Sequence, residues 1–349
     1  MTSLSSNDVI ARMSEFGKSI EPEMRKFLLK GVHSEFQDLI MWQIETGGKR
    51  LRPALTVIFA QAFGTSPDVQ EVLAAAAGIE LIHSYSLILD DIIDRGELRR
   101  GKPTVRAKYG DEFAILAGII YREAIYEAAK ATGEYFNDTI TIFSETIRKL
   151  VEGERLDILF EQNDQRTHEY FLSNRYHTVT LEDYQEMIGG KTASLLAAAC
   201  KLGAVVGGAS SDEQLAAEKF GWSAGIAFQI ADDYLDIFAV SDKFGKVIYK
   251  DIIEQKLGNF VCIQTIKALN ESEAKLFQRY LQDSSLSDID RIKKCTPLIE
   301  KANVKETVIK EAEKWAQEAK IALTMIDFKK EENKIILDQL AEFTVRRAF

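Results

Sequence analysis

Cysteine and proline are scarce in this chain of 349 residues, and each scarcity excludes a class of protein. The three cysteines, Cys200, Cys262 and Cys295, are far apart and form no CxxC pair, so they support neither a disulfide framework nor a zinc knuckle. We expect each to be a small buried side chain. Only five prolines interrupt the chain, and its apolar residues recur at helical spacing almost throughout. The sequence therefore predicts an all-α protein.

Basic residues are also too few for one class of function. The chain has 44 lysines and arginines against 54 aspartates and glutamates, which gives a formal net charge of −10. Such a chain has no broad basic field to neutralise a phosphate backbone, so we expect no nucleic-acid partner. Any anion that it binds must be met by a local basic pocket.

Long hydrophobic runs and linkers are missing as well. No apolar run reaches the roughly 18 residues that a membrane-spanning helix needs, and residues 1–26 lack a charged-then-apolar signal sequence. We therefore expect no membrane span and a cytoplasmic location. Neither an alternating strand with a hairpin turn nor a low-complexity linker divides the chain, which predicts a single all-α domain over residues 1–349.

Apolar residues are instead concentrated in shorter segments. Residues 69–91 and 192–208 carry long stretches of Ala, Leu and Ile without a turn signal, which favours helices buried on most sides. Residues 305–323 alternate charged residues with apolar ones at helical spacing. That pattern is typical of an amphipathic helix on the outside of a protein.

One acidic pattern, DDxxD, occurs twice, each time after an apolar helical segment. Its members are Asp90, Asp91 and Asp94 in the first set and Asp232, Asp233 and Asp236 in the second. Residues four apart lie nearly above one another on a helix, so each set presents two carboxylates on one face with a third beside them. One such set could be a solvated helix end. Two sets favour a clamp for magnesium, which proteins usually hold by one or two carboxylates together with substrate phosphates.

Candidate phosphate-binding residues accompany these aspartates. They are Lys49, Arg50 and Arg52 in TGGKRLRP, Lys191 and Thr192 in GGKTAS, and Lys246, Lys250 and Lys256 further on. Glycines beside them allow the backbone to approach an anion closely. The GGKT sequence is not a Walker A loop, because Gln185 stands where that loop needs a glycine and the preceding LEDYQEMI is polar and helical. This excludes a P-loop nucleotide triphosphatase.

Together these motifs resemble the trans-type isoprenyl diphosphate synthases. The resemblance covers about residues 40–260, where GGKRLRP, HSYSLILDDIIDRGELRRGKPT, GGKTA and FQIADDYLD occur in the family's order. It implies the isoprenoid-synthase helical bundle around a deep central cavity, usually as a homodimer. It also implies that isopentenyl diphosphate is added to allylic diphosphates (dimethylallyl, geranyl or farnesyl) with the help of magnesium, as three ions that bridge the allylic diphosphate.

The same resemblance implies a role for each candidate residue. Both aspartate sets would bind the metal. The residues for isopentenyl diphosphate would be Gly48, Lys49, Arg52, His83 and Arg100, and those for the allylic diphosphate Arg99, Lys191, Lys246 and Lys256. Thr192 and Gln229 would stabilise a carbocation through oxygen dipoles. After the second aspartate set the chain departs from the family, since it reads DIIEQKLGNF where members often read something like DxxEGKxTLP.

Product length depends on the residues that lie beneath the first aspartate set, Ser86, Tyr85 and Ile82. One aromatic at the fifth position before the motif, with a small residue at the fourth, resembles synthases of the twenty-carbon geranylgeranyl diphosphate. Farnesyl diphosphate is the alternative product. A terpene cyclase or a non-catalytic synthase-like subunit fits less well, because both aspartate sets are intact and a second diphosphate site is present.

Overall fold

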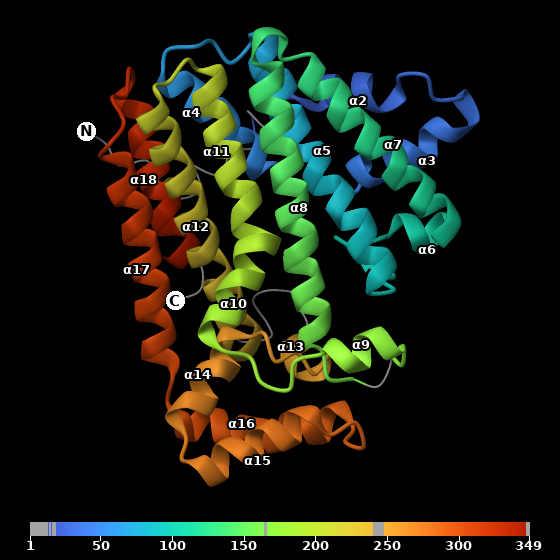
Figure 1. The fold of residues 1–349 in the computed structure, drawn as a ribbon, viewed down its shortest axis with the longest axis vertical. Helices are drawn as coiled ribbons and strands as arrows, with labels where there is room; N and C mark the ends of the chain where they lie inside the picture. Colours follow the sequence, from blue (N-terminus) through green and yellow to red (C-terminus); the bar gives the residue numbers. More distant parts are fainter. Residues whose placement is uncertain (1–12, 14, 16–18, 164–165, 240–247, 347–349) are drawn as a thin grey trace. The chain divides into compact units, whose positions relative to one another are not determined.

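The computed structural model describes residues 13, 15, 19–163, 166–239 and 248–346. The chain forms two compact units. Unit 1 comprises Met1–Arg148, Leu195–Gly221 and Lys320–Leu340, and unit 2 comprises Lys149–Ser194, Trp222–Ala319 and Ala341–Phe349. Helices make up nearly all the regular structure of the described residues, which confirms the all-α prediction (Figure 1). The single domain stays a prediction.

Unit 1 holds most of the N-terminal helices. They are α2 (Glu21–Leu29), α3 (Ser34–Glu45), α4 (Leu51–Ala62), α5 (Gln70–Ile93), α6 (Val105–Tyr109), α7 (Asp111–Lys130) and the 3₁₀ turn η1 (Gly133–Tyr135). Unit 2 holds α9 (Glu169–Asn174), α10 (Leu181–Ile188), the π-helix η2 (Gly189–Ala193), α13 (Lys250–Ile253), α14 (Phe260–Ala268), α15 (Glu271–Gln282) and α16 (Asp288–Ala302). Residues of both units occur in α8 (Phe136–Phe160), α11 (Ser194–Val206), α12 (Ser211–Phe238), α17 (Lys305–Leu323) and α18 (Glu331–Arg346).

Helix α5 is the core helix of unit 1. It packs against α2, α3, α4, α6 and α7, and its segment 74–82 is buried throughout. By length and composition alone this helix could cross a membrane, although the sequence analysis expected no apolar run long enough to do so. However, 67% of its most apolar stretch of 18 residues is buried inside the structure. Such burial is what the core helix of a folded unit requires.

A short hairpin follows α5 and was not predicted from the sequence. Strands β1 (Leu98–Arg99) and β2 (Lys102–Pro103) pair antiparallel, with two residues between them. Arg100 and Gly101 have φ of 55° and 76°, as a two-residue turn of the primed type requires. Strands of two residues are too short to show an alternating pattern, so the sequence carries no signal for them.

The core of unit 2 gathers side chains from helices that are distant in sequence. It includes Phe160 from α8, Tyr184 from α10, Phe260 from α14 and Phe277 from α15. Two of the cysteines, Cys262 and Cys295, lie in this core, and Cys200 is buried in unit 1. All three are free thiols, as expected.

Candidate active site

The GGKR segment of unit 1 forms a tight turn before α4. Gly47 and Gly48 have φ of 85° and 151°, values that other residues rarely adopt. A Cβ on Gly48 would lie 2.7 Å from Nη1 of Arg100, so glycine leaves room for that guanidinium. Lys49 follows and is exposed. The structure thus brings together Gly48 and Arg100, which the sequence assigned to one diphosphate.

Arg50, the last residue of this turn, points inward. Its backbone is left-handed, with φ of 51°, and its side chain is only 3% exposed. The guanidinium donates to Oε1 of Glu80 at 2.7 Å and to the carbonyl of Ile44 at 3.0 Å. It therefore ties the turn to the end of α3 and to the middle of α5. Arg50 therefore supports the turn.

Arg52 and His83 form the inner part of the same basic cluster. Nη1 of Arg52 lies 3.3 Å from Nε2 of His83, and because arginine cannot accept a hydrogen bond, the histidine nitrogen accepts it. Burial lowers the pKa of His83 well below its ordinary value of 6.5, and the charges of Arg52 and Arg100 lower it further. His83 is therefore neutral at pH 7. The cluster combines arginine charges with a neutral imidazole, a suitable set for an anion such as a diphosphate.

In the first aspartate set, the three carboxylates have different surroundings. Asp91 is buried and accepts two hydrogen bonds from Arg99, from Nε at 2.9 Å and from Nη2 at 2.8 Å. Asp90 is half-buried, and Asp94, at the end of α5, is exposed. Asp90 and Asp94 are more exposed than Asp91, so a metal ion from solvent reaches them more readily. Arg99, assigned to the allylic diphosphate, is here the partner of Asp91.

The residues assigned to product length lie one to two turns earlier on α5. Ile82 is buried, and Tyr85 and Ser86 are half-buried. The hydroxyl of Ser86 donates to the carbonyl of His83 at 2.9 Å. Tyr85 faces α7, since a Cβ added to Gly118 would lie 3.8 Å from its ring carbon Cε2. The role of these residues in product length stays a prediction.

In the second aspartate set, in unit 2, the middle carboxylate is again buried. Asp233 accepts hydrogen bonds from the Tyr184 hydroxyl and the Phe260 amide, both at 2.8 Å, and from Gln229 at 3.0 Å. Burial and the charge of Asp251 raise the pKa of Asp233 well above its ordinary value. Asp233 therefore serves to hold α10, α12 and α14 together. Tyr184 was not recognised in the sequence.

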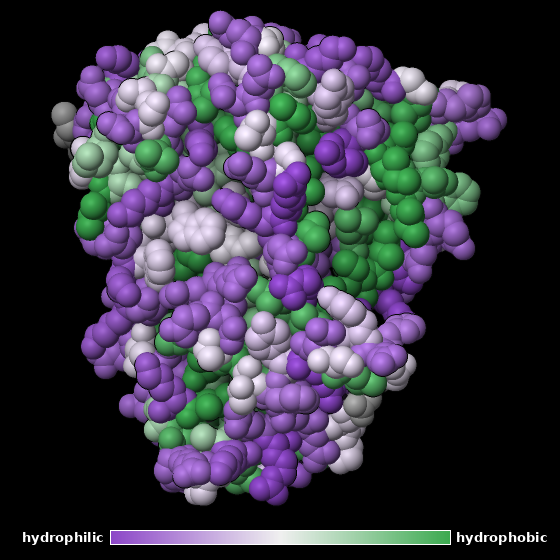
Figure 2. Space-filling model, viewed as in Figure 1, coloured by the Kyte–Doolittle hydropathy of each residue, from purple (hydrophilic) through white to green (hydrophobic). Residues whose placement is uncertain are grey.

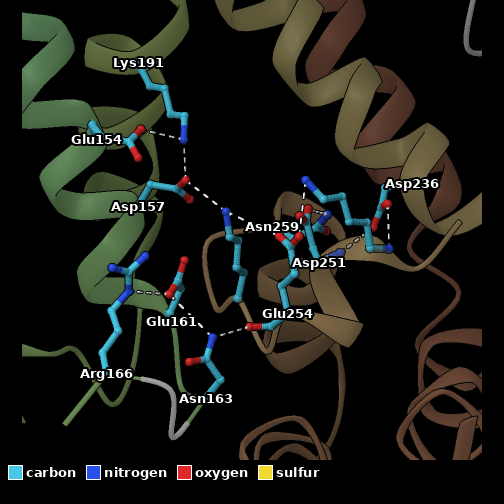
Figure 3. Close-up of polar contacts among 12 residues, drawn as sticks. Glu154, Asp157, Glu161, Asn163, Arg166, Lys191, Asp236, Asp251, Glu254 and Asn259 are labelled. Carbon is cyan, nitrogen blue, oxygen red and sulfur yellow. Dashed lines mark hydrogen bonds and ion pairs between the residues drawn. The ribbon is translucent and has the colours of Figure 1, made fainter. Parts of the chain in front are cut away.

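The outer members of this set are more accessible. Asp232 is half-buried. Asp236 accepts hydrogen bonds from the backbone amides of Lys250 at 2.9 Å and of Asp251 at 3.2 Å (Figure 3). Burial, together with the charge of Asp251, raises the pKa of Asp236 to about 7. In each set the second aspartate is thus buried, while the first and third are more exposed.

Thr192 lies in the π-helix that joins α10 to α11. Its hydroxyl donates to Oε1 of Gln229 at 2.9 Å, and Gln229 in turn donates to Asp233. The family resemblance implied the same role for Thr192 and Gln229, and the structure brings them into contact. The helix before GGKT also confirms that this segment is no P-loop.

Asp157, on α8, forms an ion pair with Lys191 (Figure 3). The same carboxylate also forms an ion pair with Lys256. Lys191 also forms an ion pair with Glu154 at 2.7 Å. Neither acid was recognised in the sequence, although Asp157 stands within the apolar run 156–160, a signal of a buried charge. Lys246, the other predicted lysine of this group, lies outside the described residues.

Comparisons with known proteins identify the relatives of this chain. The sequence profile of the polyprenyl synthetase family matches residues 33–299. A short chain isoprenyl diphosphate synthase of Methanothermobacter thermautotrophicus is 34% identical over 306 residues, 87% of this chain and 88% of the relative. A geranylgeranyl diphosphate synthase of Saccharolobus solfataricus is 32% identical over 349 residues, 99% of each chain. The crystal structure of geranylgeranyl pyrophosphate synthetase from Pyrococcus horikoshii superposes with a TM-score of 0.85 at 29% identity, covering 98% of this chain and 99% of that one.

Proposed function

We propose that this chain, which belongs to the polyprenyl synthetase family, condenses isopentenyl diphosphate with allylic diphosphates and makes geranylgeranyl diphosphate. It is an isoprenyl diphosphate synthase and so a prenyltransferase. The observation that carries the proposal is the order of groups along α5. A basic cluster at His83 is followed along the helix by Asp90, seven residues or about 10 Å further on, and then by Asp94 at the end of the helix. Two diphosphates can therefore bind next to each other.

Magnesium fits the chemistry of the outer aspartates. Among the described residues no group of three or more His, Cys, Asp or Glu side chains is placed to hold a metal ion. Magnesium does not need such a group, because it commonly binds one or two carboxylates and completes its shell with phosphate oxygens and water. Asp90, Asp94, Asp232 and Asp236 would hold the three ions of the proposal. Bound magnesium would neutralise the diphosphate that leaves.

The residues of the chain bind the substrates and stabilise charge. Arg52, Arg100 and the neutral His83 would hold isopentenyl diphosphate through hydrogen bonds to its phosphates. When the C–O bond of the allylic diphosphate breaks, the diphosphate leaves with the electron pair and an allylic cation remains. The oxygens of Thr192 and Gln229 would stabilise that cation. The double bond of isopentenyl diphosphate attacks it, and loss of a proton to the released diphosphate restores an alkene.

The test is a product analysis with the purified chain. The protein is incubated with isopentenyl diphosphate and each of the dimethylallyl, geranyl and farnesyl diphosphates, with magnesium or with excess EDTA, and the products are separated by chromatography. We expect a twenty-carbon diphosphate that depends on magnesium. A fifteen-carbon end product would identify a farnesyl diphosphate synthase instead, and a released hydrocarbon a cyclase. No condensation with any primer would refute the proposal.

We also propose that the chain acts in the cytoplasm as a homodimer whose subunits meet through α7. This helix exposes a row of large apolar side chains, Phe113, Ile115, Leu116, Ile119 and Tyr126, which are between 42% and 55% exposed. Figure 2 shows the apolar side chains gathered over the region of α7. A contiguous apolar face of this kind is typical of an interaction surface. The α7 helix of a second copy would cover these side chains, because it exposes the same apolar side chains.

A further inference from the structure

Two lysines from distant parts of unit 2, Lys191 and Lys256, form ion pairs with one carboxylate, that of Asp157. Oδ2 of Asp157, on α8, accepts a hydrogen bond from Nζ of Lys256 at 3.0 Å and another, shorter one from Nζ of Lys191. The side chains of Asp157 and Lys256 are 11% and 12% exposed. An aspartate in this position brings two ammonium groups together that would otherwise repel each other.

The backbone on both sides of Asp157 is held in place. The amide of Gln162 donates to the carbonyl of Gln255 at 3.0 Å, and the amide of Leu257 donates to Phe160 at 3.2 Å, so the segment of Lys256 runs along the end of α8. On the other side, a Cβ on Gly153 would lie 2.2 Å from the amide nitrogen of Lys191. The π-helix that carries Lys191 therefore lies directly against α8.

The neighbouring acid, Glu154, differs from Asp157. It forms an ion pair with Lys191 at 2.7 Å, whereas Asp157 pairs with both lysines. Burial alone would raise the pKa of Asp157, but the charges and hydrogen bonds of Lys191 and Lys256 outweigh it and hold that pKa below its ordinary value. Asp157 is therefore ionised at neutral pH and bound to both lysines, while Glu154 lies beside one of them.

We propose that Asp157 is a positioning residue that holds Lys191 and Lys256 together as one clamp for the allylic diphosphate. The inference rests on the proposed function, in which both lysines bind that substrate. It also assigns Lys256 a position in this clamp, although the surrounding segment 251–260 departs from the family pattern. Asp157 does not touch the substrate and acts only through the two lysines.

A matched pair of variants separates positioning from simple charge. Asp157→Asn and Glu154→Gln each remove one negative charge from the same face of α8, within one turn of each other. If charge alone mattered, both would strengthen the binding of a diphosphate. If Asp157 positions the lysines, Asp157→Asn raises the KM for farnesyl diphosphate by about tenfold, the effect of one misplaced charge-assisted contact. Glu154→Gln then leaves that KM unchanged or lowers it.

The KM for isopentenyl diphosphate serves as the internal control, because its basic cluster is in unit 1, and it should change less than twofold in both variants. A KM for farnesyl diphosphate that is unchanged in Asp157→Asn, or that moves in the same direction in both variants, would overturn the inference. If Asp157→Asn does not unfold cooperatively, Asp157→Glu replaces it, since it keeps the charge but moves it by one methylene, and the same rise is expected. A parent chain without any condensation activity would instead refute the proposed function.

Discussion

At the scale of single residues, the two aspartate sets show what the sequence can and cannot predict. The spacing predicted that each set lies on a helix, and the sets do lie at the end of α5 and within α12, because the helical repeat is a local property. It could not show that Asp91 and Asp233 are buried, since their partners Arg99 and Tyr184 come from other segments. The same holds for Arg50, whose inward direction depends on Glu80 thirty residues away.

The outer aspartates are the subject of the first prediction. Asp90→Asn or Asp232→Asn should lower kcat by orders of magnitude, because a carboxylate of the metal clamp is lost in the transition state. The fold should remain intact, since removal of one of several like charges on a helix relieves repulsion. Steady-state kinetics at saturating magnesium and circular dichroism measure the two effects. Near-normal turnover in either variant would contradict the clamp.

His83 gives a prediction about pH. In the folded chain its pKa lies well below 6.5, chiefly through burial, so the unfolded chain binds a proton that the folded chain does not. The free energy of unfolding should therefore fall as pH falls below about 6.5, by at most about 1.4 kcal/mol per pH unit from this group. In His83→Asn that part of the pH dependence should be absent. Urea unfolding of both proteins from pH 7.5 to 5 measures it, and identical pH profiles would contradict a neutral His83.

At the scale of elements, the long helices were predictable and the short features were not. The expected helices at 69–91, 192–208 and 305–323 correspond to α5, α11 and α17 with shifts of a few residues at most. Their apolar residues recur over several turns, so many positions together indicate each helix. The hairpin that carries Arg100 and the π-helix that carries Lys191 are too short for any period, and both depend on contacts with other segments.

The contact between α8 and the π-helix can be tested with one methyl group. Gly→Ala inside a helix normally stabilises by up to about 1 kcal/mol. Gly153→Ala should do the opposite and also lower kcat, because its Cβ would lie 2.2 Å from the amide nitrogen of Lys191. Gly118→Ala on α7 is the control, since its nearest neighbour would be at an ordinary 3.6 Å. Thermal unfolding and turnover of both variants measure the difference. A stabilised, fully active Gly153→Ala would show that the π-helix is not held as described.

The packing of α5 against α7 bears on product length. The ring of Tyr85 lies near Gly118, and we expect it to form part of the floor that stops the growing chain. Tyr85→Ala should therefore give products longer than twenty carbons, because the deleted ring leaves space. Product distributions are compared with the parent chain at equal conversion. If the two distributions match, Tyr85 is not the floor and the prediction of product length loses its basis.

At the scale of the whole molecule, the proposed dimer depends on the exposed apolar side chains of α7. A charge in the centre of its exposed apolar face should be tolerated by a monomer and excluded from a dry interface. Ile119→Glu should therefore convert a dimer into a monomer without lowering the helical content. Light scattering coupled to size-exclusion chromatography measures the mass. A parent chain that is itself monomeric at micromolar concentration would contradict the proposed dimer.

The three buried thiols allow the unfolding of each unit to be followed by chemical labelling. Cys200 lies in unit 1, and Cys262 and Cys295 lie in unit 2. Burial raises the pKa of each, that of Cys295 to about 12, so a maleimide cannot label them until the surrounding structure opens. Pulse labelling during denaturation, read by peptide mass spectrometry, therefore follows the opening of each unit separately. Equal labelling rates at all three sites would mean that the two units open as one cooperative body, whereas unequal rates would reveal a partly open intermediate that a single spectroscopic curve hides.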